Sequence, residues 1–172
     1  MAELSLDLER HRDLKGREDH VWARRVTLMI LGLISIFAVL NGFGQRASTA
    51  TSTGAAAQLQ VHSPERVRGG LLYQARITVK ATQRIKRPRL VLDSGWFDGL
   101  TINTVQPDPS EHVNRNGRVG FLYDQLDPGK VLTVWIQYQV NPTTIGNQTQ
   151  RVELDDGGTP LAQVERQLTV LP

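Results

Sequence analysis

The stretch Tyr73-Gln-Ala-Arg-Ile-Thr-Val-Lys-Ala81 decides the fold, because every second residue in it is apolar and the residues between them are polar. Successive side chains of a β-strand point to opposite faces, so this alternation predicts a strand with one buried face. The stretch Leu132-Thr-Val-Trp-Ile-Gln-Tyr-Gln-Val140 alternates in the same way, and its parity places Trp135 on the outward face. We therefore expect two half-buried strands here.

Shorter segments with strand character surround these two, and turn residues such as Asn116-Gly117 and Asp127-Pro-Gly129 separate them. About eight short strands with frequent turns and no helical period predict an all-β, immunoglobulin-like antiparallel sandwich of about 7–8 strands. We place this domain at residues 59–172. The shorter predicted strands are 58–62, 89–93, 100–105, 118–123, 149–154 and 161–170.

Three motifs of this region resemble those of bacterial proteins. Leu126-Asp-Pro-Gly-Lys130, followed by the long alternating strand, resembles a turn in immunoglobulin-like modules of bacterial cell-surface proteins. Trp96-Phe-Asp-Gly-Leu-Thr-Ile-Asn103 and Gln137-Tyr-Gln-Val-Asn-Pro-Thr143 are similar to stretches of small single-pass bacterial membrane proteins of unknown function. The resemblance implies the sandwich fold and supplies no activity. The chain has no cysteine, which favours a bacterial envelope protein over a disulfide-bonded eukaryotic domain.

An apolar segment precedes the domain. The eighteen residues Val26–Phe43 carry no charge, and as a helix they would span about 27 Å, close to the thickness of the hydrocarbon core of a bilayer. A buried helix of a soluble protein is the alternative, but such helices usually have a polar face. We expect a transmembrane helix at 26–43, with small residues that could let a second helix approach closely. These helix–helix packing candidates are Gly32, Ser35, Ala38 and Gly42.

The charges on either side of this helix predict its orientation. Six basic residues precede it, and only Arg46 follows within about 20 residues, so the positive-inside rule keeps the amino terminus cytoplasmic and the domain extracytoplasmic, in the bacterial inner membrane. A cleaved signal peptide remains the alternative, although the apolar run is longer than an ordinary signal-peptide core. The basic residues are Arg10, Arg12, Lys15, Arg17, Arg24 and Arg25.

The flanking segments have compositions of their own. Residues 1–25 are rich in balanced charge, which indicates a solvated cytoplasmic juxtamembrane tail, with a docking peptide as the alternative. Residues 44–58 contain mainly Ser, Thr, Ala and Gly and lack large apolar side chains. We therefore expect a flexible linker at 44–58.

We find no catalytic constellation in the outer domain. Ser63, Ser94 and Ser110 lack the Gly-x-Ser-x-Gly context of a nucleophile elbow, and the only nearby imidazoles are His62 and His112. No thiol is present and the two histidines are far apart in sequence, so neither a zinc site nor a cofactor is expected. The sequence predicts that the protein is not an enzyme.

Two aspartate-containing turns could offer oxygen ligands to calcium. Asp93 and Asp98 flank one turn, and Asp155 and Asp156 lie in another. Their spacing matches no calcium loop, and Asp is common in turns because its side chain binds nearby backbone amides. Turn chemistry is the favoured interpretation, and calcium binding stays open.

A run of cations is the most prominent polar feature. Its residues could attract an anionic envelope polymer or lipid headgroups. Alternatively, they protect a strand edge from aggregation, because Lys, Arg and Pro discourage edge-to-edge pairing. A nucleic-acid partner is disfavoured by the outside location and by the small net charge of +3. The candidate anion contacts are Arg84, Lys86, Arg87 and Arg89.

Aromatic residues are the candidate partner contacts. Trp135 faces outward by parity, where it marks a binding face unless a bulge or the other sheet covers it. Trp96 and Phe97 lie between two glycines in a turn-like context, where they could contact a partner or lipid, or pack over the open end of the sandwich.

These features favour one role and leave a second open. The preferred hypothesis is a membrane-anchored, non-catalytic sandwich that serves as an accessory or assembly module for another membrane or envelope protein. The alternative is a sensor or binder of anionic polymer or lipid headgroups through the loop 84–89.

Overall fold

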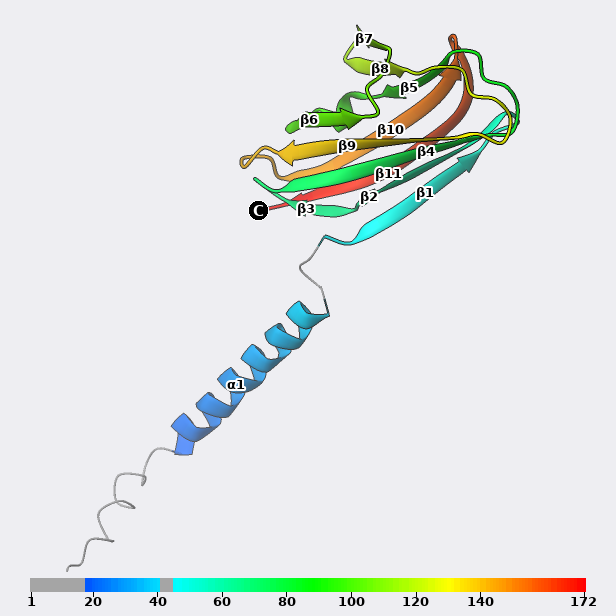
Figure 1. Ribbon diagram of the computed structural model, residues 1–172. Coiled ribbons are helices and arrows are strands. Elements are labelled where there is room, and N and C mark those ends of the chain that lie inside the picture. The colour runs from blue at the N-terminus through cyan, green and yellow to red at the C-terminus, as the bar shows by residue number, and fades with distance from the viewer. Residues whose placement is uncertain (1–17, 41–44) are drawn as a thin grey trace, which may run out of the picture. The chain divides into compact units, whose positions relative to one another are not determined.

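The computed structural model describes residues 18–40 and 45–172, which belong to two separate compact units (Figure 1). Within the first unit, the described residues form one helix, α1 (Glu18–Val39). The second unit begins at Gln45 and contains only strands and one short 3-10 helix. The two units are described one at a time below.

Helix α1 begins eight residues earlier than the predicted span. Its stretch Val21–Val39 is long and apolar enough to cross a membrane by length and composition, and none of it is buried against protein. The hydroxyl of Ser35 donates to the carbonyl of Leu31 at 2.8 Å, so this polar group is satisfied inside the helix, as an apolar environment requires. Gly42, the end of the predicted span and most of the tail at 1–25 lie outside the described residues.

The second unit consists of two sheets (Figure 1). The five-stranded sheet has the order β1 (Ala47–Thr53), β2 (Ala57–Pro64), β4 (Leu72–Ala81), β9 (Val131–Val140) and β6 (Leu100–Gln106). The six-stranded sheet has the order β3 (Arg66–Arg68), β11 (Thr159–Leu171), β10 (Gly146–Asp156), β5 (Pro88–Leu92), β8 (Arg118–Leu122) and β7 (Glu111–Arg115). The 3-10 helix η2 (Ser94–Trp96) lies between β5 and β6 in the chain.

The two alternating stretches form neighbouring strands at the centre of the fold. Strands β4 and β9 pair antiparallel, with Ile77 opposite Val134 on the buried face. The apolar residues of both strands point inward and are mostly buried, whereas the polar residues between them are more exposed. This is the alternation that the sequence predicts. All eight predicted strands are present. The described domain has eleven strands, however, and β3 pairs parallel with β11, so the prediction of a purely antiparallel sandwich of 7–8 strands is corrected.

The three additional strands are β1, β3 and β7. Strand β1 lies inside the predicted linker, so the prediction of a flexible linker across 44–58 is wrong from Ala47 onward. It forms a hairpin with β2, closed by a hydrogen bond from the amide of Gly54 to the carbonyl of Ala57 at 2.9 Å. The side chains of Ser48 and Ser52 are only half-buried at this edge of the sheet. A strand at such a position does not require large apolar residues.

An aromatic cluster occupies part of the core between the sheets. The rings of Tyr73 and Tyr138 stack with centroids 5.2 Å apart, and Trp96 lies 5.6 Å from Tyr138. The indole N–H of Trp96 donates to the carbonyl of Arg151 at 3.1 Å, so its polar group is satisfied. The cluster joins η2 to the five-stranded sheet and to β10.

A buried arginine links the two sheets. Arg166 of β11 is only 7 % exposed, and its guanidinium donates to the carbonyls of Ser63 (3.0 Å) and Pro64 (2.6 Å) at the end of β2. It forms no ion pair with a carboxylate among the described residues, and burial lowers the pKa of Arg166. The charge is therefore stabilised by carbonyl dipoles and by the amide oxygen of Gln150 at 3.4 Å.

Alkaline conditions are expected to unfold the domain through its buried tyrosines. Burial raises the pKa of Tyr73 from 10.0 to about 12, so the folded state disfavours the phenolate. The stabilising effect is complete below pH 10.0, the unfolded value, and is lost as the pH rises towards about 12. Tyr73 alone should account for about 3 kcal/mol of this loss. Thermal unfolding of the full-length protein in mild detergent, followed by circular dichroism across this pH range, measures it.

The matched variant for this prediction is Tyr73→Phe. It should show a shallower decline above pH 10.0, because one ionisable group has been removed. An unchanged decline would mean that Tyr73 does not control alkaline stability.

Candidate functional site

The outer face of the five-stranded sheet carries a row of polar side chains around one tryptophan. The strand register places Thr49, His62, Arg76, Trp135 and Gln106 side by side, one from each of the five strands. The hydroxyl of Thr49 and the Nδ1 of His62 are 2.8 Å apart, which ties the two strands at the β1 edge. The row therefore forms a continuous polar surface across the sheet.

Trp135 lies at the centre of this row. Its side chain is 37 % exposed, and the guanidinium carbon of Arg76 lies 5.2 Å from the centroid of its ring. This cation–π contact holds the indole in one orientation and leaves much of its surface accessible to solvent. Trp135 lies on the outward face, as its parity indicates, and a partner-binding role for it stays a prediction.

Trp96 and Phe97 lie elsewhere, and neither lies free on a loop. Trp96 is the last residue of η2 and is fully buried beside Tyr138, so the prediction that it contacts a partner directly is wrong. Phe97 is partly buried and packs against the core. The glycine context that indicated an exposed turn has another cause, because a Cβ on Gly95 would come within 1.9 Å of the carbonyl oxygen of Thr149. Gly95 lets the chain pass close to β10 so that Trp96 can enter the core.

Two cations of the basic run form ion pairs with carboxylates. Arg84 pairs with Asp127 at 3.1 Å, and Arg89 pairs with the buried carboxylate of Asp155 at 2.8 Å. These pairs compensate two of the four cations. Within the described chain, the exposed side chains of Lys86 and Arg87 have no ion pair. The loop is thus a weaker anion-binding feature than its sequence indicates.

The aspartates of the two turns mainly bind the backbone. Asp93 accepts from the amide of Arg151 at 3.1 Å, and Asp155 accepts from the amide of Gly158 at 3.0 Å. Asp156 accepts from the amides of Lys86 and Arg87, which connects this turn to the basic run. These contacts are the turn chemistry that the sequence favours. Across residues 18–40 and 45–172, no three acidic or imidazole side chains converge as metal ligands.

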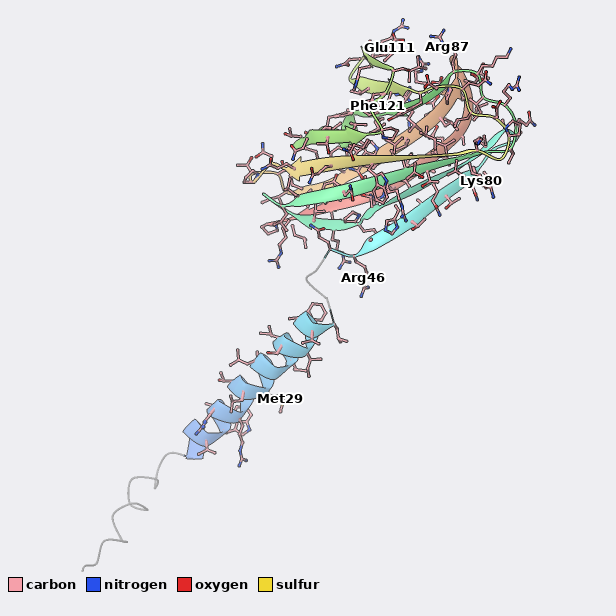
Figure 2. The ribbon with its side chains drawn as sticks, in the orientation of Figure 1. Met29, Arg46, Lys80, Arg87, Glu111 and Phe121 are labelled. Atoms are coloured by element: carbon pink, nitrogen blue, oxygen red, sulfur yellow. The ribbon has the colours of Figure 1, made fainter. Side chains whose placement is uncertain are left out.

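A groove of about 320 Å³ crosses the outer face of the six-stranded sheet. It is lined by Arg89, Arg115, Arg118 and Glu153 among others, and Arg118 pairs with Glu153 at 2.6 Å. A smaller hollow next to it is lined by Arg87 and Glu111, which Figure 2 labels near the same end of the domain. Sequence reasoning missed Arg115 and Arg118 because nothing in the sequence places them near the basic run. Three arginines and the carboxylates of Glu153 and Asp155 line the groove, so its net charge is small.

Comparison with known proteins identifies no family. No family model and no curated protein matches the chain. The CARDB domain of a Pyrococcus furiosus protein, solved in complex with di-metal ions, matches with a TM-score of 0.44 and 14 % identity over 69 % of this chain and 92 % of that one. CaCohA2 from Clostridium acetobutylicum matches with a TM-score of 0.42 and 10 % identity over 61 % and 84 %. At these scores the likenesses carry no argument about the site.

Proposed function

We propose that this chain is a single-pass bacterial inner-membrane protein that presents a non-catalytic β-sandwich outside the cytoplasm. The sandwich acts there as an accessory or assembly module that binds another membrane or envelope protein. Two independent features support the proposal, one in each unit.

The first feature is helix α1. Its large apolar side chains are mostly exposed in the described structure, and a bilayer would remove them from water. Arg24 and Arg25 sit close to the start of the apolar run, and four more cations precede them in the sequence. This asymmetry supports a cytoplasmic amino terminus and an outer domain.

The second feature, and the observation that carries the proposal, is the accessible indole of Trp135 on a polar sheet face. Large aromatic and arginine side chains dominate the energetics of protein interfaces, and here Trp135 and Arg76 form one preassembled unit. The surrounding hydroxyl, amide and imidazole groups can donate and accept hydrogen bonds at the rim. A face of this kind suits a folded protein partner.

Trp135→Ala is expected to abolish or strongly weaken the association with such a partner. The measurement is to tag the carboxy terminus, extract the full-length chain from its native membrane in mild detergent, and quantify the co-purifying chains by mass spectrometry. A hot-spot tryptophan contributes about 2 kcal/mol or more, so recovery of the companion should fall roughly thirtyfold.

The matched control is Gln139→Ala, which changes an exposed residue of the same strand and the same face. It should retain the companion at the wild-type ratio. If Trp135→Ala retained it as well, or if the wild-type chain purified without a stoichiometric companion, this function would be wrong.

A further inference from the structure

Strand β1 forms a terminal edge of the five-stranded sheet and lacks the features that usually protect a strand edge. In Figure 1, β1 lies at the outer edge of the five-stranded sheet, next to β2 only. Its sequence, Ala47-Ser-Thr-Ala-Thr-Ser-Thr53, contains no charge and no proline. Its pairing with β2 runs over all seven residues without a bulge. An edge with a regular register and no charge is a template for another strand.

The hydrogen-bond pattern shows which backbone groups are free. The amide of Gly54 donates to Ala57, and the amide of Glu65 donates to Arg46, so the even-numbered residues of β1 are those that bond to β2. The N–H and C=O groups of the odd-numbered residues therefore point away from β2. These residues are Ala47, Thr49, Thr51 and Thr53.

The three other terminal strands of the two sheets are protected in ways that β1 is not. Strand β3 has three residues, two of which are arginines. Strand β7 has five residues and carries Glu111 and Arg115 at its ends. Strand β6 has an irregular register between Ile102 and Thr104 and is followed by Pro107. Short length, charge, bulges and proline all discourage the addition of another strand. Strand β1 has none of these features, so a further strand can pair with its edge.

Strand β11 of the other sheet lies beside β1 without pairing with it. Next to the end of β1, Gly54 lies so close to β11 that a Cβ would come within 2.0 Å of the carbonyl oxygen of Leu161. Nearer its start, Thr49 and Ala50 line a hollow of about 390 Å³ together with Glu165 and Gln167 of β11. The four residues whose backbone groups point away from β2 are exposed to solvent.

The sequence of β1 itself indicates which strand could pair with its free edge. Residues 48–52 read Ser-Thr-Ala-Thr-Ser, which is a palindrome. In an antiparallel pair centred on Ala50, Ser48 meets Ser52 of a second copy, Thr49 meets Thr51, and Ala50 meets Ala50. Every cross-strand pair of this segment then has equal size, and Thr–Thr pairs are favourable. The absence of charge removes the like-charge repulsion that self-pairing of a charged strand would create.

We infer that β1 is a homodimerisation edge, on which the β1 strand of a second copy of this chain adds antiparallel and in register about Ala50. The free groups of residues 47, 49, 51 and 53 would then bond to residues 53, 51, 49 and 47 of the second copy, and the two five-stranded sheets would become one. The interface is two-fold symmetric, as homodimers usually are. It does not depend on the proposed partner of Trp135.

Disulfide trapping tests this register, because the chain has no cysteine of its own. Full-length Thr49→Cys and Thr51→Cys chains, carrying different tags, are mixed in mild detergent and oxidised gently. Directly opposed residues have Cα atoms about 5.5 Å apart, within reach of a disulfide, so the mixture should cross-link at least about tenfold faster than either variant alone. The matched control is Asn103→Cys, an exposed position on the opposite edge of the same sheet, which should remain unlinked.

Proline substitution tests the edge by a second route. The amide of Thr51 points away from β2, so Thr51→Pro removes a donor that the fold does not use. The wild-type chain should be a dimer by detergent-corrected light scattering, and Thr51→Pro should be a monomer at the same concentration with an unchanged circular dichroism spectrum. The cysteine experiment decides the question even if Thr51→Pro fails to fold.

Two results would overturn the inference. One is a wild-type monomer with no cross-link between positions 49 and 51. The other is a dimer that survives in a folded Thr51→Pro chain while the mixture of cysteine variants cross-links no faster than Asn103→Cys, because that dimer would be held by the helices or by another face. A wild-type chain that purifies without a companion, or a companion retained by Trp135→Ala, would refute the proposed function alone if the cross-link between positions 49 and 51 forms as expected.

Discussion

Trp96→Ala is expected to lower the free energy of unfolding of the outer domain by about 3–5 kcal/mol, the usual cost of truncating a fully buried tryptophan. The side chain is inaccessible to solvent and packs beside Tyr138, so the substitution leaves a cavity in the core. It also removes one of the two donors to the carbonyl of Arg151, which keeps the amide of Asp93 at 3.2 Å. Denaturant unfolding of the full-length chain in mild detergent, followed by far-ultraviolet circular dichroism, measures the change.

The matched control for this prediction is Trp135→Ala. That substitution removes an indole of equal size from the sheet surface, where only the contact with Arg76 is lost. It should cost about 1 kcal/mol or less. The two variants therefore separate a structural tryptophan from a surface one. A small effect at Trp96 together with a large effect at Trp135 would reverse the assignment of the two side chains.

Arg166→Met is expected to have the second largest effect on stability. The variant keeps a similar volume but removes the guanidinium donors to the carbonyls of Ser63 and Pro64. The carbonyl of Ser63 keeps the amide of Ser48 as its donor, whereas the carbonyl of Pro64 is left without a partner among the described residues. One buried acceptor without a partner costs about 1–3 kcal/mol, so a loss of this size is expected. The same denaturant experiment measures it.

Arg151→Met is the matched control for Arg166. Arg151 is on the neighbouring strand and forms an exposed ion pair with Glu165 at 2.7 Å. Surface ion pairs contribute little to stability, so this variant should unfold close to the wild-type midpoint. If Arg166→Met did so too, a water molecule would have to satisfy the carbonyl of Pro64, and the guanidinium would not be the link between the sheets.

The strands at the centre of the fold could be predicted because their signal is local. In β4 and β9 the buried residues recur with a period of two within a single stretch, and no distant contact is needed to recognise that pattern. The same parity places Trp135 on the outward face. The helix is equally local, since its length and lack of charge are properties of one segment.

Strand β1 could not be predicted for the opposite reason. Its Ser, Thr and Ala residues are compatible with a flexible chain, and only the register with β2 makes them a strand. The composition that indicated a linker is the same composition that leaves its edge free of charge.

The sequence by itself determined the two-part organisation, the central strands and the candidate tryptophan on the sheet surface, because each depends on a run of consecutive residues. Tertiary structure alone decided that Trp96 is buried and that half of the basic run is neutralised. Arg84 pairs with Asp127 and Arg89 pairs with Asp155, and these partners are 43 and 66 residues away in the chain. Pairing over such distances depends on which strands become neighbours, and no local pattern of residue types encodes that choice.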